Sequence, residues 1–329
     1  MATASLHENF ILPGGTRLPA IGLGTFQSDT GNSRVRETVV SALKLGYRHI
    51  DSAAAYGNER EIGQGICDSG IKREQIFLTS KLSQNWHKPK DVAEALEKSL
   101  ENLQTDYVDL YLMHFPHAYC TDASHNTLRH PDGDGKRPMI DLELSRRYAE
   151  TWKAMEALVD NGKAKFIGLS NFTILKTKRI LDIARIRPAV NQVEIHPYLP
   201  QDDLVIYCKS NGILPMAHQP LGGRPVAVVN PNASIPGPMV DECILRIASE
   251  TDSTPAQVLL SWLVQRGIPA VPKTIQESRL KENIRVFKLT ENQFQRIMVL
   301  PDSHGTVRYL DPRNHIGFDI FDEIEDQPV

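Results

Sequence analysis

Short apolar runs alternate with amphipathic segments along most of this chain, and the alternation predicts a repeated strand–helix unit. The runs are short and rich in β-branched residues, so each predicts a strand. They cover residues 21–26, 48–52, 76–81, 108–114, 166–171, 190–195, 213–218 and 268–273. A helical segment follows each strand, over residues 32–45, 58–69, 88–103, 145–161, 174–184, 201–210, 238–251 with 255–266, and 276–287.

The segment 88–103 shows why these stretches predict helix. Its apolar or small residues recur with the i, i+3, i+4, i+7 spacing of one buried face: Val92, Ala95, Leu96, Ser99, Leu100 and Leu103. Glycines mark helix ends in Asn161-Gly162, Asn211-Gly212 and Arg266-Gly267, where a left-handed residue is favoured. Before the first unit, two extended runs around Pro13-Gly14-Gly15 predict an N-terminal β-hairpin.

Eight strand–helix units without an obvious linker favour one (β/α)₈ barrel (a TIM barrel) over an open sheet. We expect a single domain over residues 1–329, with the barrel at 10–300 and a C-terminal tail at 301–329. The alternative is a pair of Rossmann-like domains. That alternative requires a dinucleotide fingerprint after the first strand, but Gly22-x-Gly24 lacks the third glycine.

Three segments are longer than ordinary connections, and long loops are often functional. They are residues 115–144, residues 219–237 and the tail. The first two follow predicted strands, so a barrel places them at the C-terminal end of its strands, where barrel enzymes hold their active sites.

Composition excludes several classes of function. The chain has 37 basic and 40 acidic residues, which argues against a nucleic-acid surface. Its four cysteines are far apart, so neither a metal site nor a disulfide framework is expected. The N-terminus lacks the features of a secretory signal, and no apolar stretch approaches a membrane span. We expect a cytoplasmic protein with no membrane partner, either a monomer or a weak homodimer.

Polar residues gather where the predicted strands end. These positions hold Asp51, Lys81, His114, Ser170 with Asn171, Gln192 with Glu194, His218 with Gln219, and Lys273. Singly, an aspartate here is more often a helix cap, a histidine a core residue and a lysine a side chain reaching solvent. Their convergence on successive strands, beside a Tyr56 that we expect to be exposed, favours catalysis.

Such a set of side chains suits carbonyl reduction. Hydride attack leaves an alkoxide that must be protonated, and tyrosine is a weak acid at neutral pH. An ammonium group at Lys81, held by Asp51, would lower the pKa of Tyr56 and make it a competent general acid. His114 could donate a hydrogen bond to the carbonyl oxygen and stabilise the developing charge.

Six segments resemble the aldo-keto reductases, in order between about residue 10 and 300. They are GYRHIDSAAAYGNEREIG at 46–63, LTSKL at 78–82, YVDLYLMHFP at 107–116, GLSNF at 168–172, NQVEIHPYL at 191–199, and VPKT with SRLKEN between 271 and 283. The family has the (β/α)₈ fold, in agreement with the strand count. The resemblance implies that Asp51, Tyr56, Lys81 and His114 are the catalytic residues.

The resemblance also implies an NADP(H) site. Expected cofactor contacts are Gly24, Thr25, Asp51, Ser170, Asn171, Gln192, His218, Gln219, Leu221, Lys273, Thr274, Ile275, Arg279, Glu282 and Asn283. In the family, the lysine and arginine matched by Lys273 and Arg279 face a 2′-phosphate, a dianion that cations bind well. The resemblance therefore implies a preference for NADP(H).

The sequence departs from the family pattern near the nicotinamide and the substrate. His218 stands where a stacking tyrosine is common, and a histidine can titrate. Phe26 and Phe115 replace frequent tryptophans, so the expected substrate contacts are Phe26, Tyr56, His114 and Phe115. The tail carries Tyr309, Phe318 and Phe321 and matches a variable family loop, which identifies no substrate.

Three other functions remain open at this level. The same residues could run a polyol or alcohol dehydrogenase in the oxidative direction, since the groups serve both directions. A non-catalytic NADPH-sensing subunit is a second alternative, although the intact set of four residues argues against it. A phosphate-handling isomerase or aldolase would use Gly222-Gly223 as its cradle, but the cofactor pyrophosphate accounts for this pair.

Overall fold

The computed structural model describes residues 8–27, 32–131, 135–223, 235–317 and 319–321. Seven strands form one parallel sheet, and four shorter strands form two antiparallel pairs. The sheet runs in the order β3 (Leu23–Gly24), β4 (His49–Asp51), β5 (Phe77–Leu82), β6 (Val108–Met113), β9 (Ala164–Ser170), β10 (Val190–Glu194) and β11 (Leu214–His218). The pairs are β1 (Asn9–Ile11) with β2 (Arg17–Pro19), and β7 (Ala118–Tyr119) with β8 (Ile140–Asp141).

The sheet closes into a barrel through the segment predicted as the eighth strand. Ala270 forms parallel bridges with Ala217 beside β11 and with Ile21 before β3. Lys273 forms a further parallel bridge with Gly24. These bridges occupy the eighth strand position as isolated pairs instead of a continuous strand. The (β/α)₈ architecture predicted from the sequence is confirmed.

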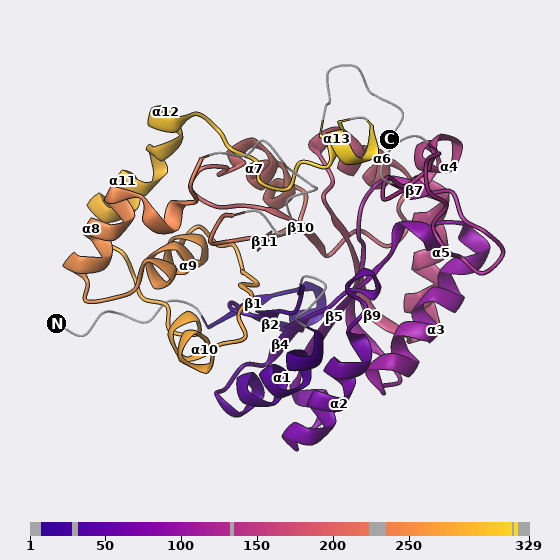
Figure 1. The fold of residues 1–329 in the computed structure, drawn as a ribbon, viewed down its shortest axis with the longest axis horizontal. Helices are drawn as coiled ribbons and strands as arrows, with labels where there is room; N and C mark the ends of the chain where they lie inside the picture. Colours follow the sequence, from indigo (N-terminus) through magenta and orange to yellow (C-terminus); the bar gives the residue numbers. More distant parts are fainter. Residues whose placement is uncertain (1–7, 28–31, 132–134, 224–234, 318, 322–329) are drawn as a thin grey trace.

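Most of the helices lie around the outer side of the barrel, whereas the short last helix lies at the end where the strands finish (Figure 1). The helices are α1 (Val35–Lys44), α2 (Glu59–Ser69), α3 (Val92–Leu103), α4 (Leu142–Arg146), α5 (Tyr148–Asp160), α6 (Ile174–Ile183), α7 (Asp202–Ser210), α8 (Glu242–Glu250), α9 (Pro255–Gln265), α10 (Glu277–Asn283), α11 (Glu291–Met298), α12 (Leu300–His304) and α13 (Arg313–Ile316). The last three were not predicted.

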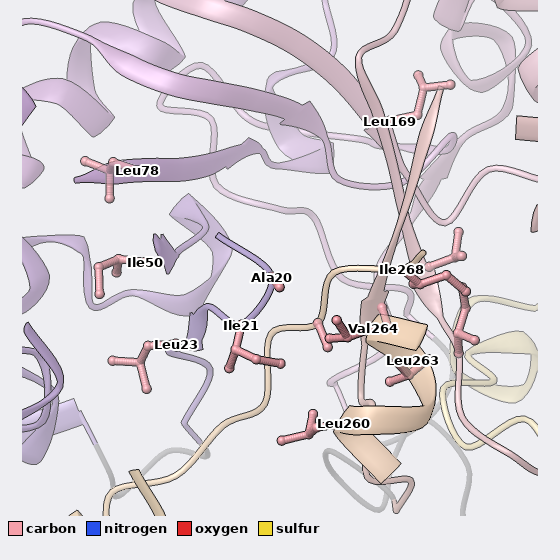
Figure 2. Close-up of a cluster of buried hydrophobic side chains, with 14 of the residues drawn as sticks. Ala20, Ile21, Leu23, Ile50, Leu78, Leu169, Leu260, Leu263, Val264 and Ile268 are labelled. Atoms are coloured by element: carbon pink, nitrogen blue, oxygen red, sulfur yellow. The ribbon is translucent and has the colours of Figure 1, made fainter. Parts of the chain in front are cut away.

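Apolar side chains fill the space between the helices and the barrel. Figure 2 shows Leu260, Leu263 and Val264 of α9 directed toward Ile21 and Ile268 in the region where the barrel closes. This helix is amphipathic only weakly, because nearly all of its side chains are buried.

The N-terminal hairpin closes one end of the barrel. Leu12 and Leu18 are buried in a cluster with Phe77 and Val190, the first residues of β5 and β10. Because strands of a parallel barrel begin at one end, the hairpin plugs that end with apolar side chains. The opposite end, where the strands finish, is left for the site.

Helix α10 departs from the sequence prediction. It ends at Asn283, whereas the pattern predicted helix to residue 287. The backbone N–H of Phe287 donates to the hydroxyl of Ser261 on α9 at 3.0 Å. A tertiary hydrogen bond therefore replaces the last helical turn that local periodicity favoured.

Candidate active site

A cavity of about 720 Å³ lies at the C-terminal ends of the strands and includes most of the predicted site residues. Its size is within the range of ligand pockets in proteins. Among the predicted residues, its lining includes Gly24, Thr25, Phe26, Asp51, Tyr56, His114, Phe115, Ser170, Asn171, Gln192, His218, Gln219, Leu221 and Lys273. Seven of the eight strand positions thus contribute predicted residues to one cavity, and Gln84, which follows β5, lines it as well.

Asp51, Lys81 and Tyr56 form a connected group beside this cavity. Lys81 is fully buried, and its ammonium donates to Asp51 Oδ1 at 2.5 Å and to Tyr56 Oη at 3.3 Å. The other carboxylate oxygen of Asp51 accepts from Gln192 Nε2 at 2.6 Å. Burial lowers the pKa of Lys81, but Asp51 and Tyr56 raise it by more, so the ammonium stays charged.

The pKa of Tyr56 is not lowered as the sequence argument predicted. Burial raises this pKa, the ammonium of Lys81 lowers it, and the carboxylate of Asp51 raises it again, so the net direction is upward. Burial is the largest cause, and the carboxylate of Asp51 adds to it by offsetting part of the field of Lys81 at the phenol. Tyr56 is also half-buried, which corrects the expectation that it is exposed.

His114 follows β6 and faces Tyr56 across the cavity. The two rings are 5.7 Å apart between centroids, with planes at 74°. Burial lowers the pKa of His114 well below its usual value, with a further contribution from Lys81, so the ring is neutral. Its buried Nδ1 has no hydrogen-bond partner among the described residues. A neutral imidazole can donate one hydrogen bond to a ligand without itself titrating.

Ser170 and Asn171 follow in the next strand and are tied to their neighbours. The hydroxyl of Ser170 donates to the carbonyl oxygen of Gln192 at 2.8 Å. Asn171 has a left-handed backbone with φ of 63°, and its Nδ2 donates to the carbonyl oxygen of His114 at 3.0 Å. Strained backbone of this kind concentrates at functional sites. These bonds fix the side chains of Ser170 and Asn171 where they line the cavity.

His218 lies in the cavity beside the amide of Asn171. Its Nε2 is 2.9 Å from Asn171 Oδ1, and because that amide nitrogen already donates elsewhere, His218 is the donor. Burial lowers the pKa of His218 to about 4, and Lys81 lowers it against the opposing effect of Glu194. A histidine at this position can titrate, as noted for the sequence, but burial moves its titration well below the neutral range.

The predicted adenosine-end residues lie at the edge of the site, on and before α10. Lys273 lines the cavity, while Arg279 is exposed on the helix. The structure does not bring the remaining predicted contacts into the lining: Thr274, Ile275, Arg279, Glu282 and Asn283. Thr274 instead accepts from the backbone N–H of Gln276 at 3.1 Å. Their proposed role depends on a ligand that extends beyond the enclosed part of the cavity.

The end of the cavity around Phe26 and Phe115 contains the predicted aromatic residues, and the lining as a whole includes several residues that sequence reasoning missed. The ring of Phe26 is 5.2 Å from that of Tyr56, and the ring of Phe115 is 5.1 Å from that of His114. Lining residues not predicted are Ala55, Gln84, His117, Tyr119, Pro220, Gly222, Gly223, Val271, Pro272, Leu310, Pro312, His315 and Ile316. Loop length indicated the three segments 115–144, 219–237 and 301–329 that contribute most of these residues, but it did not indicate which of their residues line the cavity.

The tail contributes to this end of the cavity through residues 310–316. Tyr309 is buried beside it, and Phe321 packs under the guanidinium of Arg308, which lies 3.8 Å from the ring centroid. The third tail aromatic noted in the sequence, Phe318, lies outside the described residues. Residues 224–234 of the long segment 219–237 also lie outside them.

The described part of the chain contains neither a candidate metal cluster nor a candidate membrane span. No group of three or more His, Cys, Asp or Glu side chains there is arranged to hold a metal ion. None of the helices found there has the length and hydropathy needed to cross a membrane.

Comparisons with known proteins give consistent matches. The model of the Aldo/keto reductase family matches residues 20–300. Aldo-keto reductase family 1 member A1-A of Danio rerio is 43% identical over 290 residues, 86% of each chain. Glycerol 2-dehydrogenase (NADP(+)) of Hypocrea jecorina is 36% identical over 324 residues, 97% of this chain and 99% of that one.

Solved structures agree with these matches. Aldose reductase from Schistosoma japonicum superimposes with a TM-score of 0.84 at 35% identity, covering 97% of this chain and 100% of that one. Aldose reductase from Giardia lamblia gives 0.82 at 33% identity, covering 92% and 98%.

Proposed function

The chain belongs to the aldo/keto reductase family, and we propose that it reduces the carbonyl group of a small aldehyde or ketone to an alcohol with NADPH. The observation that carries this proposal is the contact of Tyr56 with Lys81, which in turn is held by Asp51, at the edge of a cavity that His114 also faces. We propose these four residues as the catalytic set.

The cavity fits a nicotinamide dinucleotide. Ser170, Asn171 and Gln192 place hydroxyl and amide groups together at its floor, a suitable environment for a carboxamide. A Cβ on Gly223 would meet no atom of the described residues within 4 Å, so these residues leave space beside its backbone for a phosphate group. Lys273 and Arg279 would carry the positive charge for a 2′-phosphate. Bound NADPH would supply the hydride.

The protein's own residues would then handle the proton. Tyr56 donates its phenolic proton to the oxygen on which negative charge develops, because an alkoxide is a far stronger base than a phenolate. Lys81 stabilises the tyrosinate left behind, and Asp51 holds the ammonium in place. His114, neutral because of burial, donates a hydrogen bond to the same oxygen and orients the carbonyl.

Tyr56 in its resting form carries the proton that the reductive direction requires. Because its pKa is raised, the phenol keeps its proton throughout the neutral range. That form is the proton donor of the reductive direction, whereas alcohol oxidation begins by giving a proton to the tyrosinate.

A second candidate is the oxidation of a polyol with NADP⁺. It is supported by the glycerol 2-dehydrogenase of Hypocrea jecorina, which matches 97% of this chain, whereas the Danio rerio relative matches 86%. The more complete match argues for testing glycerol and its oxidised three-carbon products first.

The deciding experiment measures NADPH oxidation over aldoses, uronic acids, aromatic aldehydes and cyclic ketones, and NADP⁺ reduction over glycerol and other polyols. We expect higher kcat/KM in the reductive direction at neutral pH. Tight NADPH binding with no turnover in either direction would instead support the non-catalytic sensing subunit.

A further inference from the structure

Glu194 is the last residue of β10, and its carboxylate is buried. The proposed reaction does not use this carboxylate. The side chain of Glu194 is 1% exposed. Oε1 accepts from the backbone N–H of Tyr309 at 2.7 Å and lies 2.8 Å from His196 Nε2, while Oε2 accepts from the backbone N–H of Leu310 at 2.7 Å. Three donors therefore converge on one buried carboxylate.

The segment that this carboxylate holds belongs to the tail. Leu310 lines the cavity, and so do Pro312, His315 and Ile316, which follow it directly. These residues form the side of the cavity near Phe115, since Ile316 packs in one apolar cluster with that ring. Glu194, at the end of β10, therefore bonds the barrel to the tail segment that lines the cavity near Phe115.

Other hydrogen bonds also attach this stretch of the tail, including one from Arg308 Nη2 to Gln201 Oε1 at 3.4 Å. The backbone N–H of Val307 donates to the carbonyl oxygen of Tyr198 at 2.8 Å, and no strand pairing of the described tail to the barrel is found. The hydroxyl of Tyr309 donates to the carbonyl oxygens of Ile235 and Pro236, which belong to the other long segment at this end. Hydrogen bonds to a buried charge are stronger than neutral ones, so the two bonds to Glu194 are a strong part of the local attachment.

We propose that Glu194 is a positioning residue that holds Tyr309 and Leu310 in register and thereby sets how large substrates, and not the cofactor, bind in the cavity. The proposal rests on the carbonyl-reductase function proposed above. It predicts an effect on KM that depends on the size of the substrate, because only a substrate extending beyond its carbonyl group meets the tail.

The chain offers a matched control in Glu156 of α5. This carboxylate is also buried, and its Oε1 accepts from two successive backbone N–H groups, those of Arg185 and Ile186 at 2.7 and 2.9 Å. These residues precede β10, so Glu156 makes the same kind of bond at the opposite end of the barrel. If the loss of a buried carboxylate only destabilises the fold, replacing Glu156 should have the same effect as replacing Glu194.

The test compares Glu194→Gln and Glu156→Gln in the full chain. A glutamine at position 194 has an NH₂ group in place of one carboxylate oxygen, and this group cannot accept a hydrogen bond. At least one of the bonds from the backbone N–H groups of Tyr309 and Leu310 is therefore lost. We expect the KM for 4-nitrobenzaldehyde to rise at least tenfold in Glu194→Gln, with kcat changed less than threefold. The KM for acetaldehyde and the NADPH dissociation constant should change less than threefold, and Glu156→Gln should leave both KM values within threefold.

Hydrogen exchange of the peptide covering residues 305–312 provides a readout independent of turnover. We expect faster exchange there in Glu194→Gln and unchanged exchange in Glu156→Gln. Equal rises in KM for both aldehydes, a large change in NADPH affinity, or unchanged exchange in the tail would each overturn the proposal. A wild type that reduces neither aldehyde would overturn the proposed function and the selectivity, while exchange would still decide whether Glu194 anchors the tail.

Discussion

Three side chains at the edge of the cavity set one another's charge. Lys81 keeps its proton because Asp51 is bonded to it, and Tyr56 keeps its proton because burial outweighs the field of Lys81. Tyr56 is therefore a donor in its resting form. The geometry of this group could be predicted from the sequence, but the direction of the pKa could not, since it depends on burial and on how closely Asp51 pairs with Lys81.

Removal of the Tyr56 hydroxyl is the sharpest test of the proposed mechanism. Tyr56→Phe should lower kcat for aldehyde reduction at least a hundredfold, because general acid catalysis typically contributes 10²–10⁴. The NADPH dissociation constant should change less than threefold, or under ~0.7 kcal/mol. Steady-state kinetics and fluorescence titration measure the two. A variant that keeps more than a tenth of wild-type turnover would show that the proton comes from another group.

His218 leads to a prediction about pH. Its pKa of about 4 means that the ring is neutral from pH 5 to 8, so no charge develops beside an oxidised nicotinamide in this range. We expect the ratio of NADP⁺ affinities between the wild type and His218→Tyr to be constant over pH 5–8. Protonation would weaken NADP⁺ binding only as the pH falls toward 4. A ratio that changes near pH 6 would show that His218 titrates in the cavity close to its ordinary value.

At the scale of elements, α10 carries the proposed contact to the 2′-phosphate. We expect NADPH to bind at least tenfold tighter than NADH, a difference of ~1.4 kcal/mol, and Arg279→Ala to narrow this gap. Lys281→Ala is the matched control, because Lys281 is exposed on the same helix and pairs with Glu277 at 2.6 Å. Calorimetric titration with both cofactors measures the gap. Equal dissociation constants for NADPH and NADH in the unmutated protein would contradict the proposed role of α10.

Elements with a strong periodic pattern were predicted, and elements shaped by tertiary contacts were not. Gly162, Gly212 and Gly267 each have the left-handed backbone expected after a helix, with φ between 72° and 76°. Helix α11 was missed although Thr290 and Gln293 form a capping box before it. The positions of Leu310 and Ile316 in the cavity could not be predicted, because they depend on how a non-repetitive tail crosses the barrel.

At the scale of the whole molecule, buried histidines make stability depend on pH. Burial lowers the pKa of five histidines: His49 to about 4, His87 and His117 to about 3, His218 to about 4, and His114 well below its ordinary value. The folded state keeps them neutral while the unfolded chain protonates them near pH 6.5. The unfolded state thus binds more protons below pH 6.5, and stability is lost as the pH falls.

We expect the melting temperature to fall steadily between pH 6.5 and 5, with each buried histidine costing on the order of 1–2 kcal/mol at pH 5. His87→Leu should reduce this dependence, since neither ring nitrogen of His87 has a hydrogen-bond partner among the described residues. Thermal unfolding at several pH values is the measurement. A melting temperature independent of pH across this interval would contradict the assignment of neutral buried rings.

One core cluster extends from Ala20 to Leu300, and the described tail packs back on the same barrel. We therefore infer that barrel and tail form one domain, as the absence of a linker in the sequence suggested.

The bridges that close the barrel have a consequence for the order of folding. They join Ile21 and Gly24 to Ala270 and Lys273, positions near opposite ends of the chain, so their formation closes the longest loop in the fold. Contacts of such sequence separation form late. Gly24 and Thr25 lie on one side of this seam and Lys273 on the other, and all three line the cavity. A chain emerging from the ribosome therefore cannot complete the proposed dinucleotide site until the segment around Lys273 is available, so ligand capture would mark the closure of the barrel.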